Sequence, residues 1–370
     1  MKILHLGKFY PIMGGVEKVM YDIVTNMSED SEYCCDMLCA STDCKEHIHY
    51  INNAKIISTA TWIKVFATMI SPSMVLKLCR ICKDYKIIHI HHPDPMAALA
   101  LKLSGYKGKV VLHWHSDILK QKLTLKLYLP LQNWLIRRAD VIVGTTPKYL
   151  DSSPFLQKNN IPKVCIPIGI DSIKFDQEKV MMLREKYKNK KIIFSLGRLV
   201  EYKGYNYLIE AGKFLSDDYI ILIGGSGPLR SQLETLILNW GLQDKVKLLG
   251  RIPDEDLPIY YGACDIYVLS SIWKTEAFGI VQIEAMSCGK PIIATKIEGS
   301  GVDWVNKDGI SGINVEPMNA KAIADAAIFI LSDHERYIKF SLGSLNRFNS
   351  YFRKDLMLKK CVDLYKSLLN

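Results

Sequence analysis

The chain has 370 residues, 49% of them hydrophobic, and a formal net charge of +10 at pH 7. It is long for one domain and long enough for two, each with its own core. No stretch reaches the ~18 uninterrupted apolar residues of a membrane-spanning helix, and the first residues have a strand pattern rather than that of a signal peptide. We therefore expect a cytoplasmic protein that does not span a membrane.

Strand and helix patterns alternate along the chain, which predicts an α/β fold with two doubly wound sheets. A strand is expected over residues 1–6, a turn at Gly14-Gly15 and a helix over residues 16–26. Further strands are expected over residues 87–91, 109–113, 141–144 and 164–167, and a second run begins at Lys191 and continues at Tyr219, Val246, Asp265 and Pro291.

The domain boundary is expected near Ile170, where an apolar strand gives way to polar and charged residues. Residues 1–170 would form the first domain and residues 171–349 the second, with a charged connector over residues 179–189. Closure of the two domains about this linker is expected to complete the site.

The excess positive charge is confined to the first domain. Residues 51–150 hold 15 Lys and Arg against 4 Asp, a net of +11, and the rest of the chain has a net of -1. Two segments, residues 62–83 and 119–138, interleave Lys and Arg with apolar and aromatic residues. They are either surfaces that lie on an anionic bilayer or ordinary amphipathic helices with solvated lysines. Nucleic-acid binding is not expected, because no recognised binding module accompanies the charge.

The ten cysteines are scattered along the chain. Neither Cys34-Cys35 nor Cys79-x2-Cys82 is accompanied by the second paired cluster that a structural zinc site needs. We expect reduced thiols in the cores.

Two carboxylates, Glu276 and Glu284, are separated by seven residues around the start of an apolar helix. The pattern places the start of the helix near Phe278 and Glu284 about one turn inside it. Gly279 would let a ligand approach closely, and the first amides, those of Phe278, Gly279 and Ile280, would form a phosphate site. Spacing alone is weak evidence, and two solvated surface charges are the competing interpretation.

Two cations precede this pair in the same half of the chain. Arg198 follows the strand expected at Lys191, and Lys203 precedes a helix expected over residues 205–215. Ligands of open parallel sheets bind at the carboxyl ends of strands, where these cations emerge. The next strand closes into a glycine-rich turn, Gly224-Gly225-Ser-Gly227-Pro228, which by itself also fits a plain tight turn.

Together with Ala285-Met-Ser-Cys-Gly289-Lys-Pro291, these motifs resemble glycosyltransferase family 4, whose members are retaining enzymes of the GT-B fold. The resemblance covers the second half of the chain, and residues 1–17 and 112–154 match the first half. It implies two Rossmann-like domains facing across a cleft. The first would bind the acceptor, with a final helix at about residues 350–370 returning to it, and the second would bind the nucleotide-sugar donor.

The resemblance also implies roles for individual residues. Arg198 and Lys203 would hold the donor diphosphate, Glu276 the sugar hydroxyls and Glu284 the ribose hydroxyls. Gly15 and Gly225 would line the donor, Ile252 would contact the base through its backbone, and Phe278, Gly279 and Ile280 would present amides. Catalysis would rest on His115, Glu276, Arg198 and Lys203, without a metal or another cofactor.

His115 is expected at the carboxyl edge of a strand beside the transferred sugar, with His113 as the rival assignment because alternation puts both on one face. His89, His91 and His92 have metal-like spacing, but a strand entering a loop is their expected context, and we predict no metal site.

Several motifs resemble those of bacterial enzymes that build O-antigen, capsule or exopolysaccharide. They include residues 115–122 and 299–306. The expected reaction moves a hexose from a UDP- or GDP-sugar to a lipid-diphosphate-linked oligosaccharide, on the inner face of the cell membrane. Alternatives are a soluble sugar or sugar-phosphate acceptor, and a non-catalytic nucleotide-sugar-binding subunit. The base and the sugar stay open, because backbone atoms and pocket shape would select them.

Overall fold

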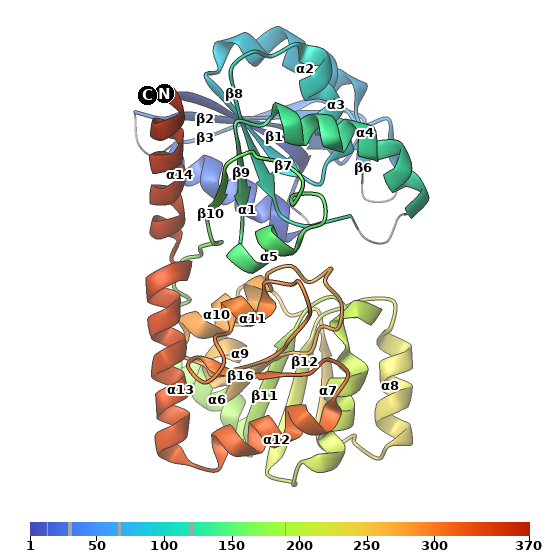
Figure 1. The fold of residues 1–370 in the computed structure, drawn as a ribbon. Helices are drawn as coiled ribbons and strands as arrows, with labels where there is room; N and C mark the ends of the chain where they lie inside the picture. The colour runs from blue at the N-terminus through green and yellow to red at the C-terminus, as the bar shows by residue number, and fades with distance from the viewer. Residues whose placement is uncertain (13, 29–31, 66–67, 119–121, 189) are drawn as a thin grey trace. The chain divides into compact units, whose positions relative to one another are not determined.

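The computed structural model describes residues 1–12, 14–28, 32–65, 68–118, 122–188 and 190–370. The chain divides into two compact units (Figure 1). Unit 1 consists of Met1–Pro167 with Asp355–Asn370, and unit 2 of Ile168–Lys354. The division after Pro167 lies close to the boundary expected at Ile170, and the chain's last helix belongs to unit 1.

Unit 1 is built on an eight-stranded sheet with the order β10-β9-β8-β7-β1-β2-β4-β3. Its strands are β1 (Lys2–Tyr10), β2 (Cys34–Ser41), β3 (His47–Ile51), β4 (Ala54–Thr59), β7 (Ile87–His92), β8 (Lys109–Trp114), β9 (Val141–Gly144) and β10 (Lys163–Cys165). All neighbours pair in parallel except β3, which runs antiparallel to β4. Strands β2, β3 and β4 were not predicted.

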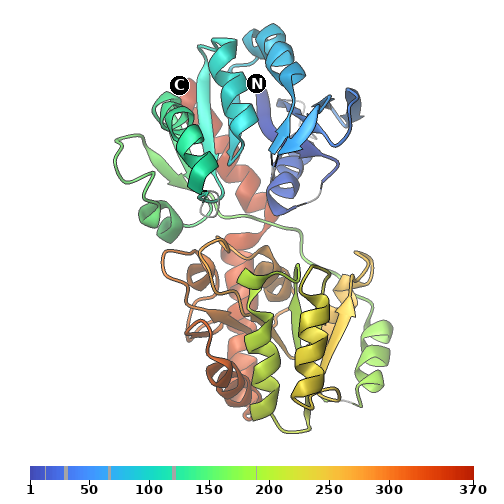
Figure 2. The same cartoon turned by 90° about the vertical axis from the view of Figure 1, so that its right-hand side faces the viewer.

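The helices of unit 1 are α1 (Gly15–Met27), α2 (Pro72–Ile81), α3 (Pro95–Ser104), α4 (Lys122–Arg138), α5 (Pro147–Ser152) and α14 (Lys354–Leu369), with a short 3-10 helix at Cys82–Asp84. Helix α3 packs against α2 and against α4 (Figure 2). Proline occupies the first turn of α2, α3 and α5, where its missing N–H costs no hydrogen bond.

The two basic segments of the first domain take different structures. Residues 63–65 and 68–70 do not form an amphipathic helix: they are the strands β5 (Ile63–Val65) and β6 (Thr68–Ile70), which pair as an antiparallel hairpin, and the α-helix of this segment is α2. Four of the six residues in the two strands are β-branched, which favours strand over helix. In the second segment, α4 begins at Lys122, and the predicted basic residue Lys120 lies outside the described residues.

Unit 2 contains a six-stranded parallel sheet with the order β13-β12-β11-β14-β15-β16. Its strands are β11 (Lys191–Leu196), β12 (Tyr219–Gly224), β13 (Val246–Gly250), β14 (Ile266–Leu269), β15 (Ile292–Thr295) and β16 (Gly312–Val315). The order confirms a second doubly wound sheet. Strand β12 is buried at all six positions, as expected for a parallel strand covered on both faces.

Helices pack against this sheet and against one another. Helices α7 (Tyr205–Ala211), α8 (Arg230–Asn239) and α12 (Ala320–Leu331) share one apolar core with the sheet, and Phe340 of α13 (His334–Arg347) belongs to the same core. Helix α6 (Gln177–Lys186) packs against α9 (Leu257–Ala263), α10 (Ile280–Ser287) packs against α13, and the short α11 (Val302–Val305) contacts β15. Short 3-10 helices lie at Glu201–Lys203 and Gly212–Phe214, and a π-helix lies at Phe348–Phe352.

The segment that was predicted as a charged connector is the helix α6. Asp176 caps it, because its carboxylate accepts from the N–H groups of Glu178 and Lys179. Val180 and the Arg184 guanidinium fix the helix to the unit, the latter through the carbonyl of Ala263 and the carboxylate of Asp265. The prediction was wrong here because one buried apolar residue gives a weak periodic signal.

Candidate donor site and the histidine cluster

The predicted cations and Glu276 meet at one edge of the unit 2 sheet. Strands β11 and β14 are neighbours, but β11 continues to β12 on one side and β14 continues to β15 on the other. Their carboxyl ends therefore form the switch point at which open α/β sheets bind ligands. Arg198 and Lys203 follow β11, and Glu276 follows β14.

Lys203 and Glu276 form an ion pair at this switch point. The Lys203 ammonium lies 2.5 Å from Oε2 of Glu276, and the two side chains are 10% and 12% exposed. Ser271 donates a second hydrogen bond to the same carboxylate oxygen, at 2.9 Å. Burial, the largest single effect, lowers the pKa of Lys203. The charge and hydrogen bond of Glu276, together with Tyr205 and Tyr202, outweigh it, and the pKa is raised. Lys203 is therefore a fixed positive charge at neutral pH.

Main-chain contacts hold both partners in place. Ser270 Oγ donates to the carbonyl of Lys203 at 2.9 Å. Ser300 Oγ donates to the carbonyl of Glu276, and the N–H of Gly301 donates to the carbonyl of Ala277 at 3.0 Å. Residues 299–306 were identified in the sequence only as part of a resemblance. Their hydrogen bonds to the main chain of Glu276 and Ala277 were not predicted. A Ser between two glycines, which allow close approach of a loop, was the available signal.

Glycines let two loops touch behind Lys203. Gly197 and Gly225 have φ of +159° and +130°. A Cβ on Gly225 would lie 1.9 Å from the carbonyl oxygen of Gly197, and one on Gly197 would lie 3.3 Å from Cε of Lys203. The predicted residue Gly225 thus permits a backbone contact that positions the loop after β11.

Arg198 and Ile252 are not partners in the ion pair. The guanidinium of Arg198 is exposed and makes no hydrogen bond or ion pair with any residue that the structure describes. Ile252 is 7% exposed, and its side chain packs closely over Gly224. A Cβ on Gly224 would lie 2.6 Å from Cδ1 of Ile252. An open hollow of about 320 Å³ beside it is lined by Arg251, Pro253, Asp254 and Glu255, none of them predicted.

The helix after Glu276 begins two residues later than predicted. It starts at Ile280, because Gly279 has a φ of +76° and cannot continue a right-handed helix. The predicted amides of Phe278 and Gly279 therefore precede the helix. The amides of its first two residues, Ile280 and Val281, have no intrahelical acceptor, and the N–H of Gln282 donates to the carbonyl of Gly279 at 2.9 Å. Phe278 is 4% exposed and packs edge-on against Phe352.

Glu284 lies one turn inside this helix, as predicted, and is half-buried. Its carboxylate accepts a hydrogen bond from the hydroxyl of the buried Tyr261 in α9. Tyr261 was not predicted, because nothing in the spacing of α9 distinguishes it from the other tyrosines. The hydroxyl of Tyr261 therefore orients the carboxylate of Glu284.

In unit 1, Gly15 is the exposed first residue of α1. Its neighbour Gly14 caps the helix in an extended conformation, with a φ of -153°, which any residue can adopt. A Cβ on Gly14 would lie 2.6 Å from a carboxylate oxygen of Glu17. Space rather than backbone conformation therefore favours glycine at this turn.

His115 follows β8 and is 5% exposed. The rings of His113 and His115 stack at 3.9 Å, so the two histidines lie on one face of the sheet, as predicted. Trp114 points to the other face, where its ring stacks on His92 at 3.7 Å and its Nε1 donates to Asp117.

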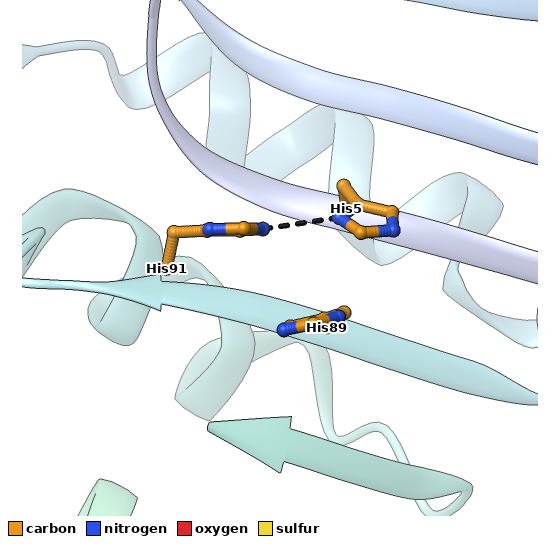
Figure 3. A group of neighbouring side chains, drawn as sticks. All are labelled: His5, His89 and His91. Atoms are coloured by element: carbon orange, nitrogen blue, oxygen red, sulfur yellow. Dashed lines mark hydrogen bonds between the residues drawn. The ribbon is translucent and has the colours of Figure 1, made fainter. Parts of the chain in front are cut away.

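Histidines of three neighbouring strands gather on one face of the sheet, which was not predicted. His5 of β1, His89 and His91 of β7, His113 of β8 and His115 just after β8 are all buried. Two groups, His5 with His89 and His91, and His91 with His113 and His115, bring possible ligand nitrogens within 4.8 Å of one another. Figure 3 shows the first group. Alternating histidines on predicted neighbouring strands were the available signal, since they must share a face.

Two family models match the chain. The model "Glycosyltransferase Family 4" matches residues 13–172, and the model "Glycosyl transferases group 1" matches residues 176–344. The first match covers most of unit 1 and ends five residues into unit 2, and the second lies within unit 2.

Curated relatives match over most of the chain. The O-antigen chain mannosyltransferase C of Escherichia coli is 30% identical over 373 residues, which cover 100% of this chain and 99% of the relative. The D-rhamnosyltransferase WbpZ of Pseudomonas aeruginosa is 28% identical over 339 residues, which cover 88% of this chain and 85% of the relative.

Solved structures share the fold. HepE of Anabaena in complex with UDP superposes with a TM-score of 0.79 at 19% identity, over 99% of this chain and 100% of that one. The sucrose-phosphate synthase of Thermosynechococcus elongatus gives 0.81 at 21% identity, over 100% and 99%. The chain therefore belongs to glycosyltransferase family 4, and it is a glycosyltransferase of the GT-B fold related to the O-antigen mannosyltransferases.

Proposed function

We propose that the protein transfers a hexose from a nucleotide-diphosphate sugar to a lipid-linked oligosaccharide, with retention, in the synthesis of a bacterial surface polysaccharide. The observation that carries the donor half of this proposal is the Lys203–Glu276 ion pair at the switch point of the unit 2 sheet. It combines a cation for phosphate with an acceptor for sugar hydroxyls in one fixed position.

The chemistry follows from where charge develops. Breaking the bond between the anomeric carbon and the diphosphate oxygen leaves an electron pair on the leaving phosphate. Cations that are already in place stabilise this charge most in the transition state. Lys203 is held by Glu276 and still has two N–H donors for phosphate, whereas the exposed guanidinium of Arg198 can fork to two phosphate oxygens.

The remaining residues of unit 2 would orient the donor. The amides of Ile280 and Val281 add the positive end of a helix to the two cations, so transfer is expected to need no metal ion. Glu284, oriented by Tyr261, would accept from the ribose hydroxyls, and the backbone of Ile252 would contact the base. Glu276 would accept from a sugar hydroxyl with the carboxylate oxygen that Lys203 does not bond.

Retention would follow from attack on the face that the diphosphate leaves. The acceptor oxygen forms its bond to the anomeric carbon on that face, and its proton passes to the leaving phosphate oxygen. No covalent nucleophile is then needed. An α-linked donor gives an α-linked product.

The names of the relatives favour a hexose donor. One relative is called a mannosyltransferase and another a D-rhamnosyltransferase, and the solved structure of HepE holds UDP. We propose a GDP- or UDP-linked hexose, with mannose, galactose, glucose and N-acetylhexosamine as candidates.

The acceptor is proposed to be at a membrane surface, with the protein cytoplasmic and peripheral. Support comes from the hairpin β5–β6, where Trp62, Ile63 and Val65 are 76%, 60% and 42% exposed around an exposed Lys64. Apolar side chains with an adjacent cation suit the headgroup region of an anionic bilayer. None of the described helices is long and apolar enough to cross a membrane.

A donor screen tests this proposal. The full chain would be incubated with UDP- and GDP-hexoses and a lipid-diphosphate-linked oligosaccharide, with and without EDTA, and the product linkage read by NMR. An α-linked product from one donor, unchanged by EDTA, is expected. A β-linked product would overturn retention, loss with EDTA would overturn metal independence, and equal use of the free oligosaccharide would favour a soluble acceptor.

A further inference from the structure

The five histidines of the unit 1 sheet form one hydrogen-bonded network with a tyrosine of the last helix. Tyr365 lies on α14, and its hydroxyl is 2.5 Å from Nδ1 of His89 and 3.4 Å from Nε2 of His5. All five rings are at most 5% exposed, and Tyr365 is fully buried. No carboxylate forms a hydrogen bond or ion pair with any of these rings in the part of the chain that the structure describes.

Two arms lead away from Tyr365. In the first, Nδ1 of His5 lies 3.0 Å from Nε2 of His91, and Nδ1 of His91 lies 2.9 Å from Nε2 of His115. In the second, Nε2 of His89 lies 3.2 Å from Nδ1 of His113. The second arm ends inside the unit, because Nε2 of His113 is buried and has no partner among the described residues. Nδ1 of His115 also has no hydrogen-bond partner among those residues, but it is not fully buried.

The geometry of these contacts fits shared protons better than a shared metal ion. The ring centroids of His91 and His115 are 5.2 Å apart, and the bonded nitrogens are 2.9 Å apart. The difference between these two distances is nearly equal to the sum of the two centroid-to-nitrogen distances within the rings. The nitrogens therefore point at each other along one line. A zinc ion on that line would need about 4 Å between them, at about 2.0 Å for each bond.

The same holds for His5 and His91, whose centroids are 5.3 Å apart with a nitrogen separation of 3.0 Å. Figure 3 shows these two rings with the facing nitrogens joined by a dashed line, while His89 lies beside them. Both contacts of the first arm are thus N–H···N hydrogen bonds.

All five rings are neutral at physiological pH. Burial lowers the pKa of His5 and of His113 to about 3 each, and it lowers the pKa values of His89, His91 and His115 as well. The ammonium of Lys8, which donates to the carbonyl of Pro93 at 2.6 Å, acts in the same direction on His91 and His115.

A neutral imidazole has one donor and one acceptor, so each arm must point all its protons the same way. Tyr365 has a single proton, and its shorter contact, to His89, takes it, since O–H donors make shorter hydrogen bonds than N–H donors. The oxygen of Tyr365 then accepts from Nε2 of His5, and Nε2–H of His91 donates to His5. Nε2–H of His115 donates to His91 in turn. In the second arm, His89 donates from Nε2 to Nδ1 of His113, and Nε2–H of His113 is the last donor. This N–H is buried without a partner among the described residues, which costs free energy.

We propose that Tyr365 is a positioning residue that acts through His5 and His91 to hold His115 as the Nε2–H tautomer. Nδ1 of His115 is then a fixed hydrogen-bond acceptor for a hydroxyl of the bound sugar, an assignment that rests on the proposed function. Tyr365 of α14 thus determines which ring nitrogen of His115 carries the proton.

The test compares Tyr365→Phe with Tyr106→Phe in the full chain. Tyr106 is the matched control, because it is also a buried tyrosine of unit 1, and its hydroxyl donates to the carbonyl of Tyr85 at 3.0 Å, outside the network. Nitrogen-15 NMR of the free protein reads the tautomer of His115, with His115→Gln used to assign its signals. Steady-state kinetics with the donor found in the screen give kcat and KM.

The expected result is one tautomer, Nε2–H, in the wild type and in Tyr106→Phe, and a mixture in Tyr365→Phe. In Tyr365→Phe, kcat should fall by about tenfold or more with an unchanged KM for the donor, because only the orientation of a proton has changed. An unchanged tautomer in Tyr365→Phe would overturn the proposal. So would the Nδ1–H tautomer in the wild type, or stoichiometric zinc binding that removes the imidazole N–H signals. The NMR result needs no substrate, so it stands apart from a failure of the donor screen, which would count only against the proposed function.

Discussion

Lys203 and Glu276 are 73 positions apart in the sequence, and yet the ammonium of one lies 2.5 Å from the carboxylate of the other. Each follows a different strand, and only the adjacency of β11 and β14 in the sheet brings them together. Because the pair is about nine-tenths buried, each partner depends on the other for its charge to be tolerated there.

Replacing Lys203 by Met should affect both transfer and stability. We expect kcat/KM to fall by about 10²- to 10³-fold, since the variant lacks the charge that is proposed to face the leaving diphosphate. The free energy of unfolding should fall by about 1–3 kcal/mol, because Glu276 keeps Ser271 but loses its cation. Lys213→Met is the control, since that lysine is exposed and lies over the ring of Trp240. Turnover equal to that of the control would contradict the site assignment.

Arg198→Ala should separate catalysis from folding. Its guanidinium is exposed and unbonded in the described part of the chain, so the urea midpoint should stay within error of wild type. Transfer should still fall by about 10²-fold or more, through loss of a forked phosphate contact. Arg230→Ala, which breaks an exposed pair with Glu234, should change neither quantity strongly. A destabilised but fully active Arg198→Ala protein would show that Arg198 is structural.

Gly225→Ala should destabilise unit 2 far more than Gly241→Ala. Both glycines have positive φ, +130° and +64°, so both substitutions carry backbone strain of about 1 kcal/mol or more. Only the Cβ at residue 225 would collide with backbone, at 1.9 Å from the carbonyl oxygen of Gly197, whereas the space around Gly241 is open. Urea denaturation measures the difference, and equal losses would show that the loops separate without cost.

Unit 1 should lose stability on mild acidification. Burial lowers the folded-state pKa of His5, His92 and His113 to about 3, against about 6.5 in the unfolded chain. Below pH 6.5 the histidines are therefore protonated in the unfolded state but not in the folded state. The free energy of unfolding falls as the pH decreases from about 6.5 to about 3. Each such histidine contributes up to about 1.4 kcal/mol per pH unit.

Hydrogen exchange at pH 7.0, 6.0 and 5.0 can follow the two units separately. Unit 2 is the internal control, since its one histidine, His334, is exposed. After correction for the intrinsic pH dependence of exchange, protection should fall in unit 1 and hold in unit 2. Equal changes in both units would attribute the acid sensitivity to groups outside the histidine cluster.

Membrane docking should depend on the exposed hairpin of unit 1. Trp62→Ser removes a side chain that is 76% exposed, and it should weaken binding to anionic vesicles without changing stability. The control is Leu342→Ser on α13, where an exposed apolar residue of unit 2 is removed. Sedimentation with neutral and anionic vesicles at low and high salt measures the effect. Binding that ignores both charge and salt would count against docking.

Sequence alone identified the family, the fold and the main elements near the proposed donor site. This succeeded because Gly224-Gly225, Glu276-x7-Glu284 and the alternating strands are local patterns, fixed by backbone conformation and periodicity. It failed where the signal was weak or where a glycine decided a boundary, as at α6 and at the start of α10.

Only the tertiary structure decided which side chains meet. That Glu276 bonds Lys203, that Tyr261 orients Glu284, and that Tyr365 reaches His89 across 276 positions all follow from the order of strands and the packing of helices. Local periodicity specifies which face a side chain takes, but not which distant side chain shares that face. The sequence therefore determined the chemical groups of this glycosyltransferase. The strand order and helix packing within each unit determined how those groups are paired, buried and charged.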